Sequence, residues 1–256
     1  MTKIWLVVER DMRMFLQYKF LLIMRAVWFF AQISLFGLVA SQMIDASKVS
    51  NYFQYYAAGV GIMMLYSTAM FIGYDIYEEA DHGVVEYLLS LPISRRELVI
   101  GRSIGGGIRS FVYVGPMLVF ILYVIGLANP INFLIAFASL FLFAFGVSGM
   151  SITFAVGIKS RDKYDIFLGV FDALIIRLST AMYPKATMLS ANTLYGSIAA
   201  FNPVTFASDL FRWGAGIERY LTSPLVALIG LFMFFSAFTL LGVAIYEKRL
   251  EGGVWE

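Results

Sequence analysis

Long, nearly uninterrupted apolar stretches restrict what this chain can fold into. Several are about 18 residues or longer, enough for an α-helix to cross about 30 Å of hydrocarbon. Sixty per cent of the residues are hydrophobic and only 14% are charged, against about a quarter in soluble domains. Lipid-embedded backbone must satisfy its own hydrogen bonds, in helices or a closed barrel. Because the apolar stretches are continuous rather than alternating, they predict an all-α integral membrane protein.

The hydropathy pattern predicts six transmembrane helices in one transmembrane domain, residues 1–256. We expect them over residues 26–44, 52–74, 104–126, 132–157, 165–183 and 223–246. Fourteen basic residues then fall on one side: Lys3, Arg10, Arg13, Lys19, Arg25, Arg95, Arg96, Arg102, Arg109, Lys159, Arg161, Lys163, Lys248 and Arg249. The other side has Lys48, Lys185, Arg212 and Arg219. The excess of basic residues predicts a multi-pass protein of the cytoplasmic membrane with both termini in the cytoplasm.

Two segments outside the predicted spans are also apolar. Residues 1–25 mix charges with Trp5, Phe15 and Phe20, which favours a helix lying at the cytoplasmic interface over a charged extension of the first span. Residues 184–222 form the longest external connection. They are too apolar for a free loop and too interrupted for a span, so we expect re-entrant or interfacial half-helices there.

A cytoplasmic segment, residues 77–103, contains the stretch LLSLPISRRE between two apolar runs. Pro92 ends any helix that precedes it. Ser94 and Glu97 have the spacing of a capping box, so a second helix should begin at Ser94 and continue into the third span. Before Pro92, Asp81 could cap a short amphipathic helix over residues 82–90.

The predicted helix–corner–helix could transmit a push from a cytoplasmic partner into the second and third spans. We expect its acidic side, formed by Glu78, Glu79, His82 and Glu86, to point outward. The alternative is an amphipathic loop that is solvated and has no partner.

This segment resembles a motif in the membrane subunits of ABC-2 type ATP-binding-cassette exporters. That motif has an acid-rich stretch, then Gly-Thr-Leu-Glu, Leu-Leu-x-x-Pro, and Ser-Arg followed by an acid. Residues at matching spacing are Glu79, Asp81, Gly83, Glu86, Leu88, Leu89, Pro92, Ser94, Arg95, Arg96, Glu97 and Gly101. The chain departs from it at Val84, where Thr is usual, and at Asp81, where Glu is commoner. The external stretch FNPVTFASDLFRW is similar to a second family motif, through Asn202, Pro203, Val204, Thr205, Phe206, Asp209 and Arg212.

The resemblance implies that residues 82–90 form a coupling helix that docks on an ATPase subunit. It also implies that two membrane subunits, most simply a homodimer, enclose a transport path and work by alternating access. The sequence contains no G-x-x-x-x-G-K-[ST] phosphate loop, so ATP and Mg²⁺ would be bound by the partner ATPase. We therefore expect a non-enzymatic permease subunit with no cofactor, no metal and no nucleic-acid partner. No residue pattern indicates the substrate.

Two charges lie within the fifth predicted span, Asp172 and Arg177. Charges inside a membrane are costly and suggest a function. Five residues correspond to about 140° around a helix, so the two side chains do not face each other. Asp172 could line the transport path or belong to a buried polar network, whereas Arg177 could extend to the external interface.

Other candidates have simpler explanations. His82 with Glu78 and Glu86 could suggest a metal site, but a solvated helix face explains them better, since zinc needs more converging ligands. Gly101, Gly105, Gly106 and Gly107 favour close helix packing over phosphate binding. An ion- or proton-coupled transporter using Asp172 is the main alternative function, although it usually requires more intramembrane acids and an internal repeat. A membrane-integral enzyme lacks a catalytic cluster, and an assembly or immunity factor remains a further alternative.

Overall fold

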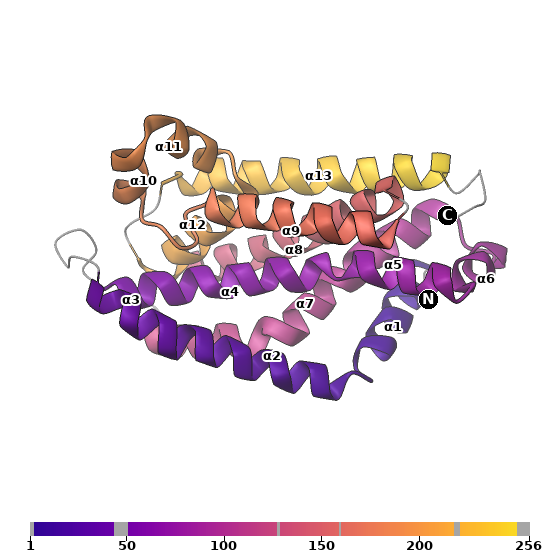
Figure 1. The fold of residues 1–256 in the computed structure, drawn as a ribbon, viewed down its shortest axis with the longest axis horizontal. Helices are drawn as coiled ribbons and strands as arrows, with labels where there is room; N and C mark the ends of the chain where they lie inside the picture. Colours follow the sequence, from indigo (N-terminus) through magenta and orange to yellow (C-terminus); the bar gives the residue numbers. More distant parts are fainter. Residues whose placement is uncertain (1–2, 44–50, 127–128, 159, 218–220, 250–256) are drawn as a thin grey trace.

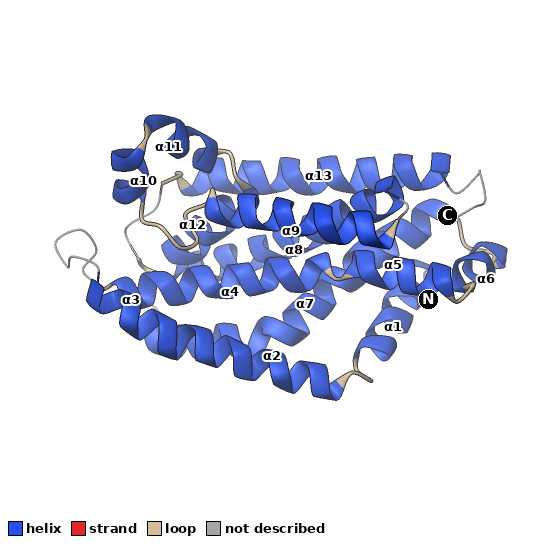
Figure 2. Cartoon of the chain, viewed as in Figure 1, coloured by secondary structure: helices blue, strands red, loops and turns tan. Residues whose placement is uncertain are grey.

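A computed structural model describes residues 3–43, 51–126, 129–158, 160–217 and 221–249. All regular structure in these ranges is helical (Figure 2). In chain order the helices are α1 Lys3–Phe15, α2 Lys19–Ala31, the π-helix η1 Gln32–Gly37, α3 Leu38–Met43, α4 Tyr52–Met70, α5 Ile72–Asp81, α6 Val84–Ser90, α7 Arg95–Ile125, α8 Pro130–Ile158, α9 Arg161–Arg177, α10 Lys185–Ala191, α11 Thr193–Ala200, α12 Pro203–Ala215 and α13 Pro224–Arg249 (Figure 1). The expected all-α fold is confirmed.

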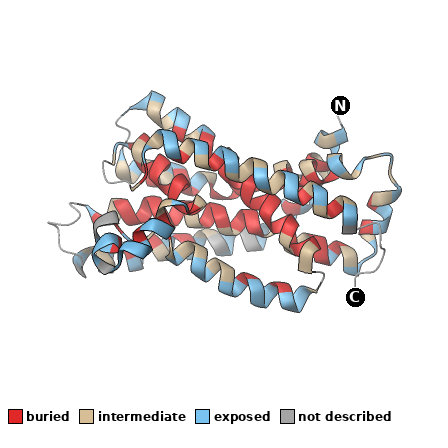
Figure 3. Cartoon of the chain, turned by 90° about the horizontal axis from the view of Figure 1, so that it is seen from above, coloured by how far each residue is buried: buried red, intermediate tan, exposed pale blue. Residues whose placement is uncertain are grey.

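Helix α8 is the central element of the bundle, because it packs against α13, α12, α7 and α4. Small residues allow this close packing. A Cβ added to Gly149 would lie 3.3 Å from the backbone of Phe238, and one added to Gly146 would lie 2.7 Å from the ring of Phe234. Interfaces between membrane helices are commonly built this way. The buried residues accordingly lie along the inner faces of the long helices (Figure 3).

Four helical segments of the described chain are long and apolar enough to cross a membrane: Tyr52–Asp81, Arg95–Ile125, Pro130–Ile158 and Pro224–Lys248. They coincide with the second, third, fourth and sixth predicted spans. The first predicted span corresponds to a shorter apolar helix, Ala26–Gln42. The fifth corresponds to α9, whose 17 residues include several charges. The membrane protein is confirmed, and the count of six spans stays a prediction.

The prediction of one interfacial helix over residues 1–25 is wrong in its boundary. Helix α1 ends at Phe15, and α2 begins at Lys19 and enters the first predicted span, which η1 and α3 continue. The break allows α1 to bury Val7, Val8 and Phe15 and to pack on α7 while α2 takes another direction. In Figure 1, α1 is steeply inclined to the long helices.

The two ends of the bundle carry different short elements. Helices α1 and α6 and the last turns of α13 lie at one end, and α10, α11 and α12 lie at the other (Figure 1). The predicted external segment is therefore helical, in three short pieces. We call these the α6 end and the α12 end of the bundle.

Candidate functional site

The corner between α5 and α7 begins two residues later than the sequence suggested. Helix α5 continues to Asp81, and α6 starts at Val84 rather than at residue 82. Asp81 is thus the last residue of α5 and does not cap α6, which corrects the prediction. Gly83 makes the break, because its φ of 67° is left-handed, and glycine adopts this conformation at little steric cost.

The start of α7 is the capping box that the sequence predicts. The Ser94 hydroxyl accepts a hydrogen bond from the Glu97 backbone N–H at 3.2 Å, and the Ser94 backbone N–H donates to the Glu97 carboxylate at 2.8 Å. Leu91, just before Pro92, is extended with ψ of 153°, as proline requires of the residue before it. Helix α7 therefore has a fixed starting point and leaves the corner in a fixed direction.

Helix α6 has one face buried against the protein and one face exposed. Val85 and Leu88 are buried, whereas Glu86 and Tyr87 are exposed and Leu89 is half-buried. Leu88 therefore anchors the helix and offers no contact to a partner. Glu86 and Tyr87 remain available on the outer face.

The corner is also attached to the end of α13. The Arg96 guanidinium forms an ion pair with the Glu247 carboxylate at 2.6 Å, and Arg95 donates to the Glu247 backbone carbonyl at 3.0 Å. Both contacts join residues about 150 positions apart in the sequence. A movement of the corner would therefore also displace the end of α13.

Glu79 points into the protein, so the prediction that it shares the outward acidic face is wrong. Its side chain is 5% exposed and forms ion pairs with Arg10 of α1 and Arg102 of α7. A buried carboxylate requires such partners to offset its desolvation. The contact joins α1, α5 and α7, and we call Arg10, Glu79 and Arg102 the inner triad.

The sequence pattern predicts no contact for Arg10 or Arg102 beyond their positive charge on the cytoplasmic side. The sequence does contain one signal for this contact, because the glycines of α7 predict close helix packing. A Cβ on Gly101 would lie 2.8 Å from Val7 of α1, which confirms that prediction. This close packing brings α1 near enough for Arg10 to reach Glu79.

The structure separates the two charges of the fifth predicted span. Asp172 is half-buried and accepts a hydrogen bond from the Tyr66 hydroxyl of α4 at 2.6 Å. Arg177 is exposed at the last residue of α9. The Tyr66–Asp172 hydrogen bond is a polar contact between α9 and α4.

The second motif forms the start of α12. The Asn202 side chain accepts a hydrogen bond from the Val204 backbone N–H at 2.8 Å and donates to the Ile175 and Leu178 carbonyls at 2.7 and 2.9 Å. Pro203 occupies the first turn of the helix, where its missing N–H costs nothing. Asn202 therefore caps α12 and also ties it to the end of α9.

Asp209 and Arg212 are completely enclosed within the α12 end. Arg212 donates to the Thr180 and Ala181 carbonyls, each at 2.9 Å, and to the Tyr55 carbonyl at 3.1 Å. Its guanidinium lies 3.5 Å from the centre of the Tyr55 ring. Asp209 accepts from the Thr180 hydroxyl at 2.8 Å and from the Leu221 and Thr222 backbone N–H groups at 2.9 Å. We call Tyr55, Thr180, Asp209 and Arg212 the outer network. It connects α12 to α4 and to the segment after α9.

A comparison with protein-family models decides the family of this helical bundle. The model described as ABC-2 type transporter matches residues 2–216. The chain belongs to the ABC-2 type transporter family. A search of curated proteins found no match.

Membership of this family gives the chain its general role. An ABC-2 type chain is the membrane-spanning permease component of an ABC transporter and not the ATPase, and its family works with an ABC ATPase. The matched region includes the α5–α6–α7 corner, the inner triad and α12. The matched region and the apolar helices make this ABC-2 protein a multi-pass membrane protein.

Proposed function

We propose that this chain is the permease half of an ATP-driven exporter, coupled to its ATPase through α6. The observation that carries the proposal is the exposed face of α6. The short helix is anchored by Val85 and Leu88 and presents Glu86 and Tyr87 outward, within the segment that resembles the family motif.

The corner supports coupling because it is connected to most of the bundle. Helix α6 lies directly between α5 and α7, and the inner triad adds α1. The ion pair of Arg96 with Glu247 adds α13. A displacement of α6 by a partner would therefore move four helices together, which is what alternating access requires of a coupling element.

The side of the membrane follows from the charges. The basic residues assigned to the cytoplasm by the positive-inside rule include Arg10, Arg95 and Arg161, which belong to α1, α7 and α9. Their helices begin at or near the α6 end (Figure 1). We infer that the α6 end and both termini face the cytoplasm, and that the α12 end faces outward across the cytoplasmic membrane.

The ATP and Mg²⁺ would belong to the partner, since the sequence contains no phosphate-loop motif. A second copy of this chain would complete the path, as the family resemblance implies. The outward face of α9 is apolar, with Ile166 72% and Val170 59% exposed. Such a face can be covered by lipid or by a second permease.

The experiment is co-purification of the chain with the ABC ATPase encoded beside its gene, in lipid nanodiscs. We expect the wild type to retain the ATPase and Glu86→Arg to reduce the retained amount about tenfold, equivalent to about 1.4 kcal/mol of binding free energy. The matched control is Asp162→Arg, which reverses an exposed acid on α9. Equal retention by wild type and Glu86→Arg would reject α6 as the docking element.

A further inference from the structure

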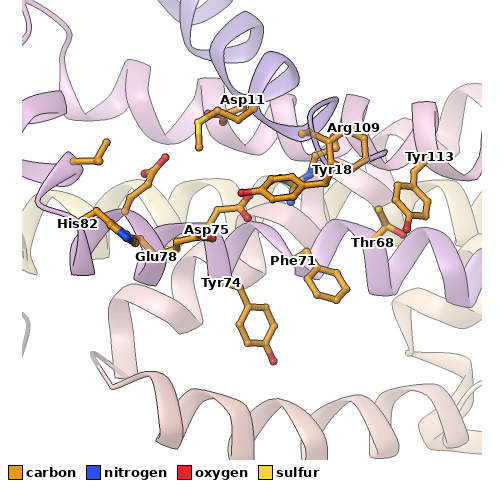
Figure 4. Close-up of a pocket in the computed structure, with 14 residues that line it drawn as sticks. Asp11, Tyr18, Thr68, Phe71, Tyr74, Asp75, Glu78, His82, Arg109 and Tyr113 are labelled. Atoms are coloured by element: carbon orange, nitrogen blue, oxygen red, sulfur yellow. The ribbon is translucent and has the colours of Figure 1, made fainter. Parts of the chain in front are cut away.

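A cavity of about 570 Å³ lies at the α6 end, between α1, the α4–α5 pair and α7 (Figure 4). Small-molecule sites commonly have volumes of about 300–1,000 Å³. No local sequence pattern indicates this cavity, because its walls come from segments far apart in the chain.

The lining carries more negative than positive charge. Asp11, Asp75, Glu78 and Glu79 all contribute to the walls, whereas Arg109 is the one arginine among the lining residues. Arg109 is itself paired with Asp75. Glu78 is exposed and forms no ion pair with any cation in the described part of the chain. With Arg10 and Arg102, which pair with Glu79, three arginines stand against four carboxylates, so the site favours a cation over an anion.

Asp11 provides a second and independent indication. Its side chain is 7% exposed, and the residue lines the cavity. One oxygen, Oδ1, accepts from Arg10 at 3.3 Å, but the buried Oδ2 has no hydrogen-bond partner among the described residues. Burial raises the pKa of this carboxyl, and Arg102 and Arg10 oppose that shift. A ligand that brings a positive charge near Oδ2 would compensate the buried oxygen.

The remaining wall is aromatic. Tyr18 is half exposed and lies near Asp11, Asp75 and Arg109 (Figure 4), whereas the rings of Phe71 and Tyr74, 5.5 Å apart, project from the α4–α5 pair away from Asp11. Aromatic faces attract cations and also cover apolar groups. The wall already does this within the protein, because the Arg109 guanidinium lies 5.2 Å from the centre of the Phe15 ring.

A metal ion does not suit these residues. Metal sites need several ligands that converge on one point. Among the described residues, no three side chains of His, Asp or Glu are grouped closely enough to hold an ion. The carboxylates are spread around an aromatic cavity, an arrangement that fits a larger and more diffuse cation.

We propose that this cavity binds an organic ammonium cation attached to an apolar body, with Glu78 and Asp11 as its carboxylate partners and Tyr18 against the apolar part. The same chemistry can come from a free cationic amphiphile or from the headgroup of a choline lipid. Binding at this site does not depend on the ATPase, so it is independent of the proposed function.

The test uses benzyltriethylammonium, a water-soluble cation, in equilibrium dialysis against the full chain in an uncharged detergent. We expect saturable binding of one cation per chain and no binding of benzenesulfonate, an anion of similar size. Glu78→Gln should weaken binding about three- to fivefold, as expected for a partly exposed charge pair. Asp11→Asn should weaken it at least as much, and Asp162→Asn, an exposed acid outside the cavity, should leave it unchanged.

Glu78 is exposed, so its substitution should leave folding intact and keep the test valid even if Asp11→Asn does not fold. Added phosphatidylcholine distinguishes the two sources: displacement of the probe identifies a lipid headgroup, and no displacement identifies a free cation. The proposal is wrong if the wild type does not bind the probe. It is also wrong if Glu78→Gln binds as tightly as wild type, or if phosphatidylglycerol, which has no ammonium, displaces the probe as well as phosphatidylcholine does.

Discussion

Each end of the bundle buries an arginine with a carboxylate, but the two arginines are held differently. At the α12 end, Arg212 donates to three backbone carbonyls and lies against the Tyr55 ring, and among its nitrogens only Nε lacks a partner within the described chain. At the α6 end, Arg102 relies on Glu79, and both its Nε and Nη1 lack described partners. The hydrogen bonds of Arg212 in the outer network are nearly complete, whereas those of Arg102 in the inner triad are not.

The difference fits two mechanical roles. The carbonyls that Arg212 binds belong to the backbone of the turn after α9 and of the first turn of α4, so the outer network clamps α12 to both in one arrangement. The inner triad consists of three side chains from three separate helices and lies beside a cavity. Side chains can exchange partners when helices shift, so the α6 end is the one suited to move.

The largest expected effect tests the dependence of Arg102 on one carboxylate. Glu79→Gln should lower the free energy of unfolding by about 3–5 kcal/mol, because it leaves Arg10 and Arg102 without their shared buried partner. The measurement is the midpoint of thermal unfolding in detergent. Glu78→Gln, at the exposed neighbouring position, is the matched control and should unfold like the wild type. Similar midpoints for the two variants would show that the inner triad does not stabilise this end.

A second pair of variants compares the rigidity of the two ends. A Cβ on Gly59, near Arg212, would lie 1.7 Å from the Ala181 carbonyl oxygen, whereas a Cβ on Gly105 of α7 would meet Asp11 at 3.4 Å. Gly59→Ala should therefore lower the free energy of unfolding by about 1–3 kcal/mol, since the backbone at Ala181 has to move. Gly105→Ala should give a folded protein with nearly the wild-type unfolding midpoint. A stable Gly59→Ala protein would contradict the rigid clamp.

Asp209→Asn, in the outer network, should lower the free energy of unfolding less than Glu79→Gln does. In Asp209→Asn the guanidinium of Arg212 keeps its three carbonyl acceptors, so we expect a loss of about 1–3 kcal/mol. The two substitutions should be measured together under the same detergent and salt conditions. A loss at Asp209 as large as that at Glu79 would remove the contrast between the ends.

The smallest effect is expected at the exposed pair of the α6 end. Arg96→Ala breaks its ion pair with Glu247, but the Arg96 side chain is 70% exposed, and exposed pairs contribute little to stability. The unfolding midpoint should not change measurably. A clear decrease would show that the attachment of the corner to α13 is stronger than solvent exposure suggests.

The sequence predicted the parts of the structure that depend on local patterns. Hydropathy located the long helices, and the spacing of Ser94 and Glu97 identified the start of α7. It placed α6 two residues early, because Asp81 looks like a cap while the left-handed break at Gly83 has no local polar signal. The capping preference of Asp81 predicts a start at residue 82, but the left-handed backbone at Gly83 sets the start of α6 at Val84.

Contacts between distant segments could not be predicted in this way. Glu79 has the same sequence environment as the exposed Glu78, and only the packing of α1 and α7 makes one of them buried. The same holds for Asp172, whose partner Tyr66 is 106 positions away. The cavity lined by Asp11 and Tyr74 likewise depends on tertiary packing.

Site-specific photocross-linking can show whether the outer face of α6 touches the ATPase, as we propose. A photoreactive phenylalanine analogue would replace Tyr87 on α6, which is 64% exposed, or Phe201 near the α12 end, which is 83% exposed. With the ATPase co-expressed, we expect a cross-linked product of the combined mass from position 87 and none from position 201. No product from position 87, or an equal product from position 201, would contradict it.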